Sequence, residues 1–419
     1  MIRSARIRPL RAVAAGAAAM LVASSLTAPP ARAAEKDVPV AVGVRLSSLA
    51  SPATGGREDT SLLTVELGGE DGAQVEYLDA GAVAATATVP EMAGALTAPA
   101  GRDVVAAANG DFFDIGATGA PRGAAMRDGE ALKSPTGDRV EAAVFGEDGT
   151  GRIGTVRFEG TADLPSGEVG LDALNAHVVP DGGLGLYTPE WGDRSRKGAA
   201  KGAKRVAEAV VAGDVVREVR DGAGGGAIEE GTEVLVGLGK AADRVAGLEK
   251  GDAVSVDYRL DAGGPARTVI GGHRVLVRDG APTGASDGAR HPRTAIGFSA
   301  DGRRMFLAAV DGRISGVPGA TLPEVARMLA DAGADQALEL DGGGSSALLA
   351  RSPGKDGLKK RNRNGGDRER PVPNGLAVTA VSGDALAAGP GPVPPPRALP
   401  RSGGPLAADA PRVPAPAAR

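Results

Sequence analysis

An aspartate stands between an apolar segment and three glycines in the stretch QALELDGGGSSALLA, residues 336–350. The apolar run before Asp341 has the composition of a buried strand, so we expect the carboxylate at a strand end. Glycine at positions 342–344 leaves main-chain N–H groups open and permits a ligand to approach closely. A concave nest of such N–H groups suits an anion such as phosphate.

Two further apolar segments end in the same kind of residue. VVAAANGDFFD places Asn109 and Asp111 after an apolar run, and MFLAAVDGR places Asp311 and Arg313 after another. If the three strands are neighbours and run in the same direction, their ends form one polar rim. Each motif taken alone is more often a turn, because Asp-Gly is a common turn dipeptide. Three such ends together with an arginine favour a site.

Other residue types near these motifs leave alternatives open. HPRTAIG contributes His291, for which a purely structural role is equally expected, and Arg293, whose planar guanidinium suits phosphate or carboxylate recognition. Ser345 and Ser346 could be nucleophiles, but no base is recognisable and we expect them to donate hydrogen bonds or shape the turn. The motifs of zinc peptidases, P-loop proteins and serine hydrolases are missing. A hard cation held by the three aspartates stays an alternative.

Composition excludes several classes of protein. The 419-residue chain has a formal net charge of −4 and 2% aromatic residues, so neither charge nor stacking surface favours a nucleic-acid partner. It contains no cysteine, which excludes disulfides, thiolate metal sites and a cysteine nucleophile. A chain of this length can bury a sufficient core without disulfides.

Both ends of the chain read as segments outside the folded domain. Residues 1–33 have an arginine-rich start, a short apolar run and an Ala-Arg-Ala cleavage pattern, which is typical of a secretory signal peptide. The apolar run is too short for a comfortable membrane anchor, so we expect a secreted, extracellular protein without stable membrane insertion. Residues 385–419, rich in proline and alanine, are expected to form a disordered tail.

Between the two ends, many short β-like runs end in Gly or Asp-Gly turns. We expect an α+β fold with a strand-rich mixed sheet and few helices, in one domain over 40–384 with a β-rich insertion at 155–270. One helix is expected over 321–335, with Thr321 and Glu324 at capping-box spacing. Two basic segments, 187–205 and 355–370, are expected to be solvated flexible loops or, alternatively, to attract a polyanion.

Several sequence blocks, taken in order, carry a resemblance to a known family. NGDFFD, GGHRVLVRDG, HPRTAIGFSADG, LAAVDGR, ALELDGGGSS and RPVPNGLAV together resemble the phosphodiester glycosidase family from about residue 100 to 380. The resemblance implies hydrolysis of the bond between a sugar's anomeric carbon and a phosphodiester oxygen. Asp111, His273 and Glu339 depart from the family's usual residues, so the sugar is not carried over.

The resemblance also implies roles for individual residues. Asp341 or Asp111 is expected to act as nucleophile, base or electrostatic stabiliser, with His291 and Asp311 as further catalytic candidates. Residues expected to bind substrate or phosphate are Asn109, Arg293, Thr294, Arg313, Gly342, Gly343, Gly344, Ser345, Ser346, Arg370 and Asn374. No cofactor is expected to be required, with a divalent cation such as calcium as the open alternative.

The predicted function is therefore a secreted hydrolase of glycosyl 1-phosphodiesters, with phosphorylated envelope or extracellular glycans as substrate. Two alternatives stay open: a non-catalytic module that binds anionic glycans, and a metal-dependent phosphodiesterase that cleaves P–O. Convergence of Asp111, Asp311 and Asp341 in one site would favour an enzyme, and scattered carboxylates would favour a binding module. The sequence predicts no oligomeric state.

Overall fold

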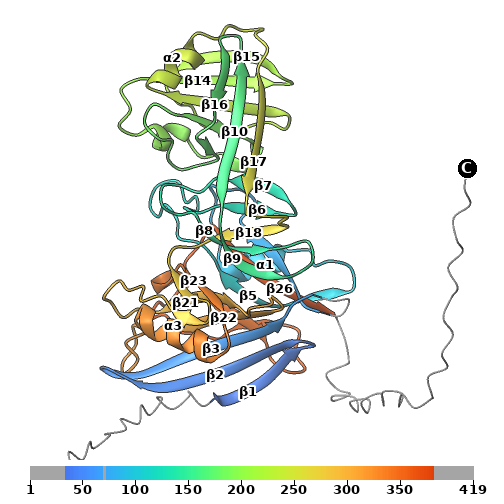
Figure 1. Cartoon of the computed structure of the whole chain (residues 1–419), viewed down its shortest axis with the longest axis vertical. Coiled ribbons are helices and arrows are strands. Elements are labelled where there is room, and N and C mark those ends of the chain that lie inside the picture. Colours follow the sequence, from blue (N-terminus) through green and yellow to red (C-terminus); the bar gives the residue numbers. More distant parts are fainter. Residues whose placement is uncertain (1–33, 69–71, 382–419) are drawn as a thin grey trace, which may run out of the picture.

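The computed structural model describes residues 34–68 and 72–381 (Figure 1). The predicted signal peptide and the predicted tail lie outside these residues. The described chain is strand-rich, as the sequence predicts, and its strands are accompanied by three α-helices. These helices are α1 (Val89–Ala95), α2 (Lys240–Ala246) and α3 (Leu322–Asp331).

The largest sheet has eight antiparallel strands and forms the base of the molecule (Figure 1). The central strands β21 and β22 are apolar on both faces, because both faces are covered. Alternate residues of β22, such as Leu307 and Phe306, enter two different hydrophobic clusters. In spatial order the strands are β1 (Ala34–Ala41), β2 (Val44–Ala53), β3 (Gly56–Glu66), β22 (Arg304–Val310), β21 (Arg293–Phe298), β23 (Gln336–Leu340), β19 (Val275–Arg278) and β20 (Ala281–Pro282).

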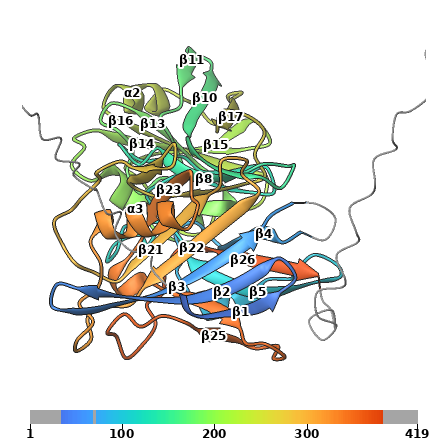
Figure 2. The same cartoon turned by 60° about the horizontal axis from the view of Figure 1, so that its bottom comes forward.

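Helix α3 covers one face of this sheet beside β19, β21 and β23 (Figure 2). It starts as the sequence predicts, because the main-chain N–H of Thr321 donates to the Glu324 carboxylate at 2.8 Å. Its predicted apolar face is buried against the sheet. The chain leaves α3 and enters β23 directly, so Asp341 lies at a strand end.

A second sheet packs its inner face against the first, and α1 covers its outer face. Small side chains such as Ala106 and Ala108 of β5 point to the shared core, while Ala107 points to α1. In spatial order its strands are β25 (Leu358–Lys360), β24 (Leu348–Arg351), β5 (Arg102–Asn109), β26 (Asn374–Val381) and β4 (Gln74–Asp79).

A third sheet lies above these two and leads into the upper part of the molecule (Figure 1). Its strands, in spatial order, are β7 (Glu130–Lys133), β6 (Ala125–Arg127), β18 (Thr268–Gly271), β8 (Glu141–Phe145) and β9 (Gly151–Thr155). Figure 1 shows the paired strands β10 and β17 rising from this level. These two strands and the residues between them, 165–254, form the upper part.

The upper part contains two sheets and a hydrophobic cluster formed largely by its own residues. Its place as a family-variable insertion stays a prediction. The strands of one sheet are β11 (Gly167–Gly170), β10 (Arg157–Leu164) and β17 (Ser255–Asp261). Those of the other are β12 (Ala173–Leu174), β13 (Leu184–Tyr187), β16 (Thr232–Leu238), β14 (Val206–Ala212) and β15 (Val215–Asp221).

Two sequence expectations need correction at this level. Every pairing between named strands is antiparallel except β12–β13, so the expected mixed sheet is nearly an antiparallel one. Segment 187–205 is not a solvated loop, because Trp191 is buried and the buried Arg196 donates to Glu208 (Nε–Oε2 3.0 Å). No helix in the described part of the chain has the length and apolar character needed to span a membrane.

Candidate functional site

The predicted rim of strand ends is formed at the level of the backbone. Strands β22 and β23 flank β21, with Val310 opposite Arg293 and Leu340 opposite Thr294. Because both are antiparallel to β21, they run in the same direction and end at the same edge. Their ends, followed by Asp311 and Asp341, therefore lie about 10 Å apart, two strand spacings.

Strand β5 reaches this edge from the second sheet. The main-chain N–H of Asp341 donates to the carbonyl of Gly110 at 2.9 Å. The Asn109 side-chain amide donates to the carbonyl of Asp341 at 2.7 Å. These two bonds join the two sheets at the start of the glycine turn, so the main chains of the predicted motifs meet in one region. Of the three carboxylates only that of Asp341 opens on it, so the full convergence that would favour an enzyme over a binding module is not found.

Four residues expected to bind substrate are instead buried supports of this junction. Asn109 Oδ1 accepts from Thr294 Oγ1 at 2.9 Å, and Thr294 Oγ1 also lies 3.0 Å from Ser346 Oγ. Asn374 Oδ1 accepts from the main-chain N–H of Asp111 at 2.9 Å. All four are buried, and their polar groups form hydrogen bonds with other groups inside the protein. The expectation that they contact substrate is therefore corrected to a positioning role.

Arg293 is likewise a structural residue. Its Nε donates to the carbonyl of Ala320, and its two terminal nitrogens bond to Asp287, Glu339 and the carbonyl of Ala289. A guanidinium has five N–H donors, and here each has an internal acceptor. The expectation that Arg293 clamps phosphate is wrong for this arrangement, because no donor is left for a ligand.

The glycines after Asp341 are explained by two other arginines. A Cβ at Gly343, whose φ is +61°, would lie 3.0 Å from Arg313 Nη2. A Cβ at Gly344 would lie 2.5 Å from Arg370 Nη2. Two guanidiniums thus rest directly on the turn, where any side chain would displace them.

These two arginines are poised for an anion. Both are exposed, and neither forms an ion pair with any residue that the structure describes. Arg370 Nη1 donates weakly to Ser345 Oγ at 3.3 Å, while Arg313 has no side-chain partner among the described residues. Arg313 also adopts φ +58°, an uncommon conformation for a non-glycine residue that is characteristic of functional loops. Guanidiniums without an ion-pair partner beside an open turn have the chemistry that phosphate recognition requires.

Asp341 lies at the edge of this anion site and is partly exposed. Burial raises its pKa to about 6, although hydrogen bonding to Ser345 and the charge of Arg370 act in the opposite direction. Ser345 therefore links the carboxylate to Arg370. At neutral pH the carboxylate is largely ionised and can stabilise positive charge that develops next to the bound anion.

Asp111 is close to Asp341 but enclosed. Its side chain is 1% exposed and accepts from the main-chain N–H of Gly123, while its second oxygen has no hydrogen-bond partner among the described residues. Burial raises the pKa of Asp111 to about 7. The expectation that Asp111 acts directly on substrate is corrected, because its carboxylate does not reach the surface.

The Asp311 carboxylate is bonded to Arg363 and does not face the glycine turn. Its two oxygens accept from the main-chain N–H of Arg363 at 2.8 Å and from Arg363 Nε at 2.7 Å. Burial raises its pKa despite this contact. The expected catalytic role is corrected to one of holding the segment 355–370, because both oxygens are occupied.

Segment 355–370 is accordingly anchored at the site rather than free. Asn364 Nδ2 donates at 3.0 Å to the carbonyls of Gly344 and Ser346, and Asn362 Nδ2 donates to Ser346. Neither asparagine is among the site residues predicted from the sequence. The only signal in the sequence was the pair of amide side chains in RNRN, residues 361–364, within an otherwise basic run. By anchoring the segment, the two asparagines place Arg370 over Gly344.

His291 lies two residues before β21, and its main chain pairs with Ala320. Its imidazole is partly exposed and has no hydrogen-bond partner among the described residues. Burial and the charges of Arg293 and Arg313 lower its pKa, so the ring is neutral at pH 7. A neutral imidazole near Arg313 can accept a proton.

The three aspartates do not form a metal site. Within residues 34–68 and 72–381, no three His, Asp or Glu side chains are arranged to hold a metal ion. Asp311 faces Arg363, and Asp111 is enclosed. The alternative in which these three carboxylates share a cation therefore lacks its geometry.

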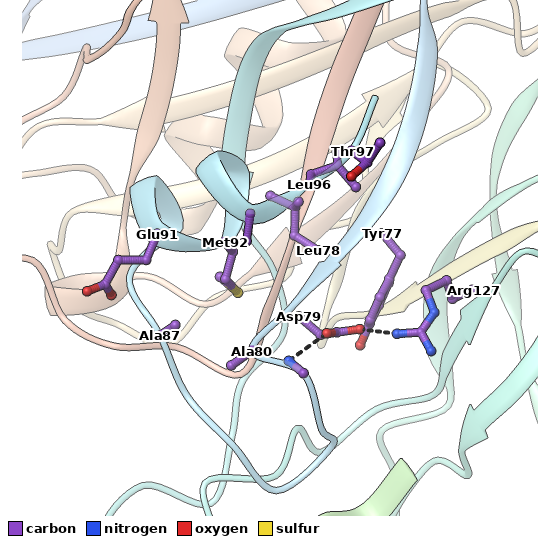
Figure 3. A pocket seen from close by; sticks show the side chains of 12 residues that line it. Tyr77, Leu78, Asp79, Ala80, Ala87, Glu91, Met92, Leu96, Thr97 and Arg127 are labelled. Atoms are coloured by element: carbon purple, nitrogen blue, oxygen red, sulfur yellow. Dashed lines mark hydrogen bonds and ion pairs between the residues drawn. The ribbon is translucent and has the colours of Figure 1, made fainter. Parts of the chain in front are cut away.

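A cavity of about 620 Å³ lies beside Tyr77, which contacts the buried supporting residue Asn374 (Figure 3). It is lined by the end of β4 and by α1, and Figure 3 shows Asp79 bonded to Arg127 at its wall. The Tyr77 hydroxyl, on the same wall, accepts from Asn374 Nδ2 at 3.0 Å. None of the residues predicted to carry the chemistry lines this cavity, so it is separate from the anion site.

Two solved structures share the fold. A hypothetical protein from Synechocystis aligns with a TM-score of 0.67 and 22% identity, over 84% of this chain and 64% of that one. The chain therefore spans somewhat less than two thirds of that protein. A protein from Burkholderia pseudomallei aligns with a TM-score of 0.60 and 22% identity, over 78% of this chain and 75% of that one.

A third solved structure is more distant. The catalytic domain of zebrafish N-acetylglucosamine-1-phosphodiester alpha-N-acetylglucosaminidase aligns with a TM-score of 0.41 and 16% identity, over 83% of this chain and 86% of that one. No curated protein matches the sequence. Residues 205–379 match the family model described as phosphodiester glycosidase. That match includes Arg313, Asp341 and Arg370, and it confirms that this chain resembles the phosphodiester glycosidase family.

Proposed function

We propose that this protein hydrolyses the bond between sugar C1 and the phosphodiester oxygen of glycosyl 1-phosphodiesters. The observation that carries the proposal is the pair Arg313 and Arg370, which rest on Gly343 and Gly344 beside the Asp341 carboxylate without acidic partners among the described residues. The match of residues 205–379 to the phosphodiester glycosidase model supports the same reaction class.

In the proposed reaction the two guanidiniums and the Asp341 carboxylate have different roles. The guanidiniums bind the phosphodiester and stabilise the phosphate monoester as it leaves with the bonding electron pair. The transition state at C1 resembles an oxocarbenium ion, and the Asp341 carboxylate stabilises its positive charge. Water supplies the hydroxyl group to C1, so the products are the free sugar and a phosphate monoester. His291, neutral at pH 7, is the proposed acceptor of the proton from water.

The cellular setting is part of the proposal and rests on the sequence. The arginine-rich start and short apolar run of residues 1–33 support secretion, and the compartment favours phosphorylated envelope or extracellular glycans as substrate. The proposed leaving group is already stable as an anion, so the proposed mechanism needs no cofactor to activate it.

The test uses the chain without the predicted signal peptide, residues 34–419, and a panel of UDP-sugars and sugar 1-(methyl phosphates) in ¹⁸O-labelled water. The decisive reading is the released phosphate, because the sugar hydroxyl at C1 exchanges with solvent. Unlabelled phosphate would mean C1–O cleavage and support the proposal. Labelled phosphate would mean P–O cleavage, and a chelator control would then test for a metal-dependent phosphodiesterase. Absence of turnover on every substrate would favour the glycan-binding module.

A further inference from the structure

A second group of basic side chains lies on the opposite flank of Asp341 from Arg313. In the eight-stranded sheet the order β22, β21, β23, β19 places Arg313 after β22 and Asp341 after β23. His273 and Arg274 immediately precede β19, and the His273 N–H donates to the carbonyl of Glu339 at 2.9 Å. Asp341 therefore lies between Arg313 and this second group, and the strand ends that carry Arg313 and His273 are about three strand spacings, or about 14 Å, apart.

The second region is built around a partly exposed aromatic ring. The guanidinium of Arg139 lies 5.0 Å from the ring centroid of Phe112. The ring of His273 meets the same phenyl edge-on at 5.6 Å. The main-chain N–H of Arg122 donates to the carbonyl of Phe112 at 2.8 Å, so Arg122 belongs to the same group. Phe112 follows Asp111 directly in the sequence.

Asp111 attracts Arg139 and Asp114 attracts Arg122 electrostatically, but no carboxylate among the described residues forms a hydrogen bond with either guanidinium. Arg122 Nε and Arg139 Nη1 are buried and have no hydrogen-bond partner among the described residues. The nearest acid to Arg139 is Asp138, 3.7 Å away, whose side chain is 87% exposed and thus well solvated. Glu339 contributes little, because its carboxylate is bonded to Arg274 and Arg293.

The loop that carries both arginines is held rigidly. Lys133 is fully buried, and its Nζ donates to the carbonyls of Gly123 (3.1 Å) and Ser134 (2.7 Å) and to Thr136 Oγ1 (3.2 Å). The carbonyl of Arg122 accepts from the Thr136 N–H at 2.9 Å. Burying an ammonium group is costly, and here its hydrogen bonds fix the backbone between Arg122 and Arg139. A fixed pair of guanidiniums loses little freedom when it binds a ligand.

We propose that Arg122 and Arg139 form a second anion-binding subsite, with Phe112 as its apolar wall, for a phosphate or carboxylate group carried by the sugar. The proposal rests on the proposed function for the identity of the substrate, since the first anion site takes the phosphodiester. It narrows that substrate to a glycan whose scissile sugar bears a second negative charge. A neutral sugar would leave both guanidiniums without a hydrogen-bonded anion.

The first experiment measures binding and does not depend on turnover. Calorimetric titrations compare glucose 6-phosphate, glucuronate and glucose, with the wild-type chain and the Arg139→Gln, Arg139→Lys and Arg259→Gln variants. Arg259 is an exposed residue of β17 paired with Glu159, so its variant is a control for lost positive charge. We expect Arg139→Gln to weaken binding of the anionic sugars at least fivefold, and Arg139→Lys to restore part of that loss.

The outcomes of this titration are distinct. A loss confined to glucose 6-phosphate would identify phosphate as the ligand group, and a loss confined to glucuronate would identify a carboxylate. The subsite would be overturned if Arg139→Gln bound both anionic sugars as tightly as the wild type does. It would also be overturned if Arg259→Gln lost as much affinity as Arg139→Gln. Thermal denaturation of each variant shows whether it is folded. If Arg139→Gln does not fold, the Arg122→Gln variant tests the same subsite.

The second experiment separates this proposal from the proposed function. It compares kcat/KM for glucose 1-(methyl phosphate) with the same compound carrying a 6-phosphate or a C6 carboxylate. We expect the wild type to prefer an anionic sugar at least tenfold, and Arg139→Gln to lose that preference while retaining turnover of the neutral one. Turnover without any preference would refute the subsite alone. Binding at the subsite without turnover of any compound would refute the proposed function alone.

Discussion

The side-chain amide of Asn109 donates to the main-chain carbonyl of Asp341 at 2.7 Å, across 232 positions of sequence. The oxygen of the same amide accepts from Thr294 Oγ1 and from the main-chain N–H of Ala347, each at 2.9 Å. One buried side chain thus joins β5, β21 and both ends of the glycine turn. The position of the Asp341 carboxylate is therefore set by the junction of two sheets, and not by the turn alone.

Replacement of Asp341 by Asn tests its proposed role. The amide keeps the size of the side chain but cannot carry the negative charge that stabilises C1, so we expect kcat/KM to fall by roughly 10²–10⁴-fold. The measurement is steady-state kinetics on a substrate that the wild type hydrolyses. Turnover close to that of the wild type would show that the catalytic charge lies elsewhere.

The same variant has an expected signature in stability. The raised pKa of Asp341, about 6, means that the folded protein binds this proton more tightly than the unfolded chain. The resulting stabilisation is present below the unfolded value and is lost as the pH rises through about 6. Asp341→Asn should therefore be more stable than wild type at about pH 8, by about 1 kcal/mol after allowance for solvent screening, and equally stable near pH 4. Thermal denaturation at both pH values checks this sign.

Arg370→Gln should move the pH dependence of activity. In the wild type we expect kcat/KM to rise as Asp341 ionises near pH 6. The charge of Arg370 lowers the pKa of Asp341, so its removal should shift the midpoint to higher pH by up to about 1 unit. The pH profile of kcat/KM measures the shift, with Arg259→Gln as the control. A midpoint that stays in place would show that the titration belongs to another group.

Much of the fold was predictable because its signals are local. The apolar runs of β21, β22 and β23, the glycine turns and the capping residues of α3 each follow from neighbouring positions in the sequence. The gathering of Asn109 and Asp341 at one place followed from their positions at strand ends. The antiparallel order of the sheets and the burial of segment 187–205 required contacts between distant strands, which periodicity does not contain.

The sequence did not distinguish binding residues from supporting ones. Arg293 and Arg313 both stand beside a strand end, yet Arg293 is saturated by Asp287 and Glu339, which reach it from other segments, and Arg313 is not. Lys133 gave no signal, because a lysine in a short β run is usually exposed. Arg139 was missed for a similar reason, since its partners Phe112 and His273 come from distant parts of the chain.

Two glycines of the turn should respond differently to the same substitution. In Gly344→Ala the new Cβ meets Arg370 Nη2 at 2.5 Å, the mobile end of a side chain that can move away. In Gly342→Ala it meets the carbonyl oxygen of Pro292 at 2.7 Å, which the backbone holds in place. We expect Gly344→Ala to raise KM several-fold with an unchanged Tm, and Gly342→Ala to cost about 1–3 kcal/mol of stability. A lowered Tm in both would mean that Arg370 is part of the folded core.

Asp311→Ala tests whether this carboxylate acts on substrate or holds the segment 355–370. The change removes the acceptor of both the main-chain N–H and Nε of Arg363, whose side chain is 62% exposed. We expect a stability loss of about 1–2 kcal/mol and faster tryptic cleavage of the segment. KM should rise because Arg370 is no longer held over Gly344, while kcat should change by less than about threefold.

The matched control for this variant is Lys359→Gln, an exposed residue of the same segment whose main chain pairs with β24. It should leave cleavage elsewhere in the segment and KM close to those of the wild type. Whether KM or kcat changes in Asp311→Ala decides between the two roles of Asp311. A loss of kcat by a thousandfold or so, with the segment still protected from trypsin, would return Asp311 to the catalytic role that the sequence predicted and show that Arg363 releases it during turnover.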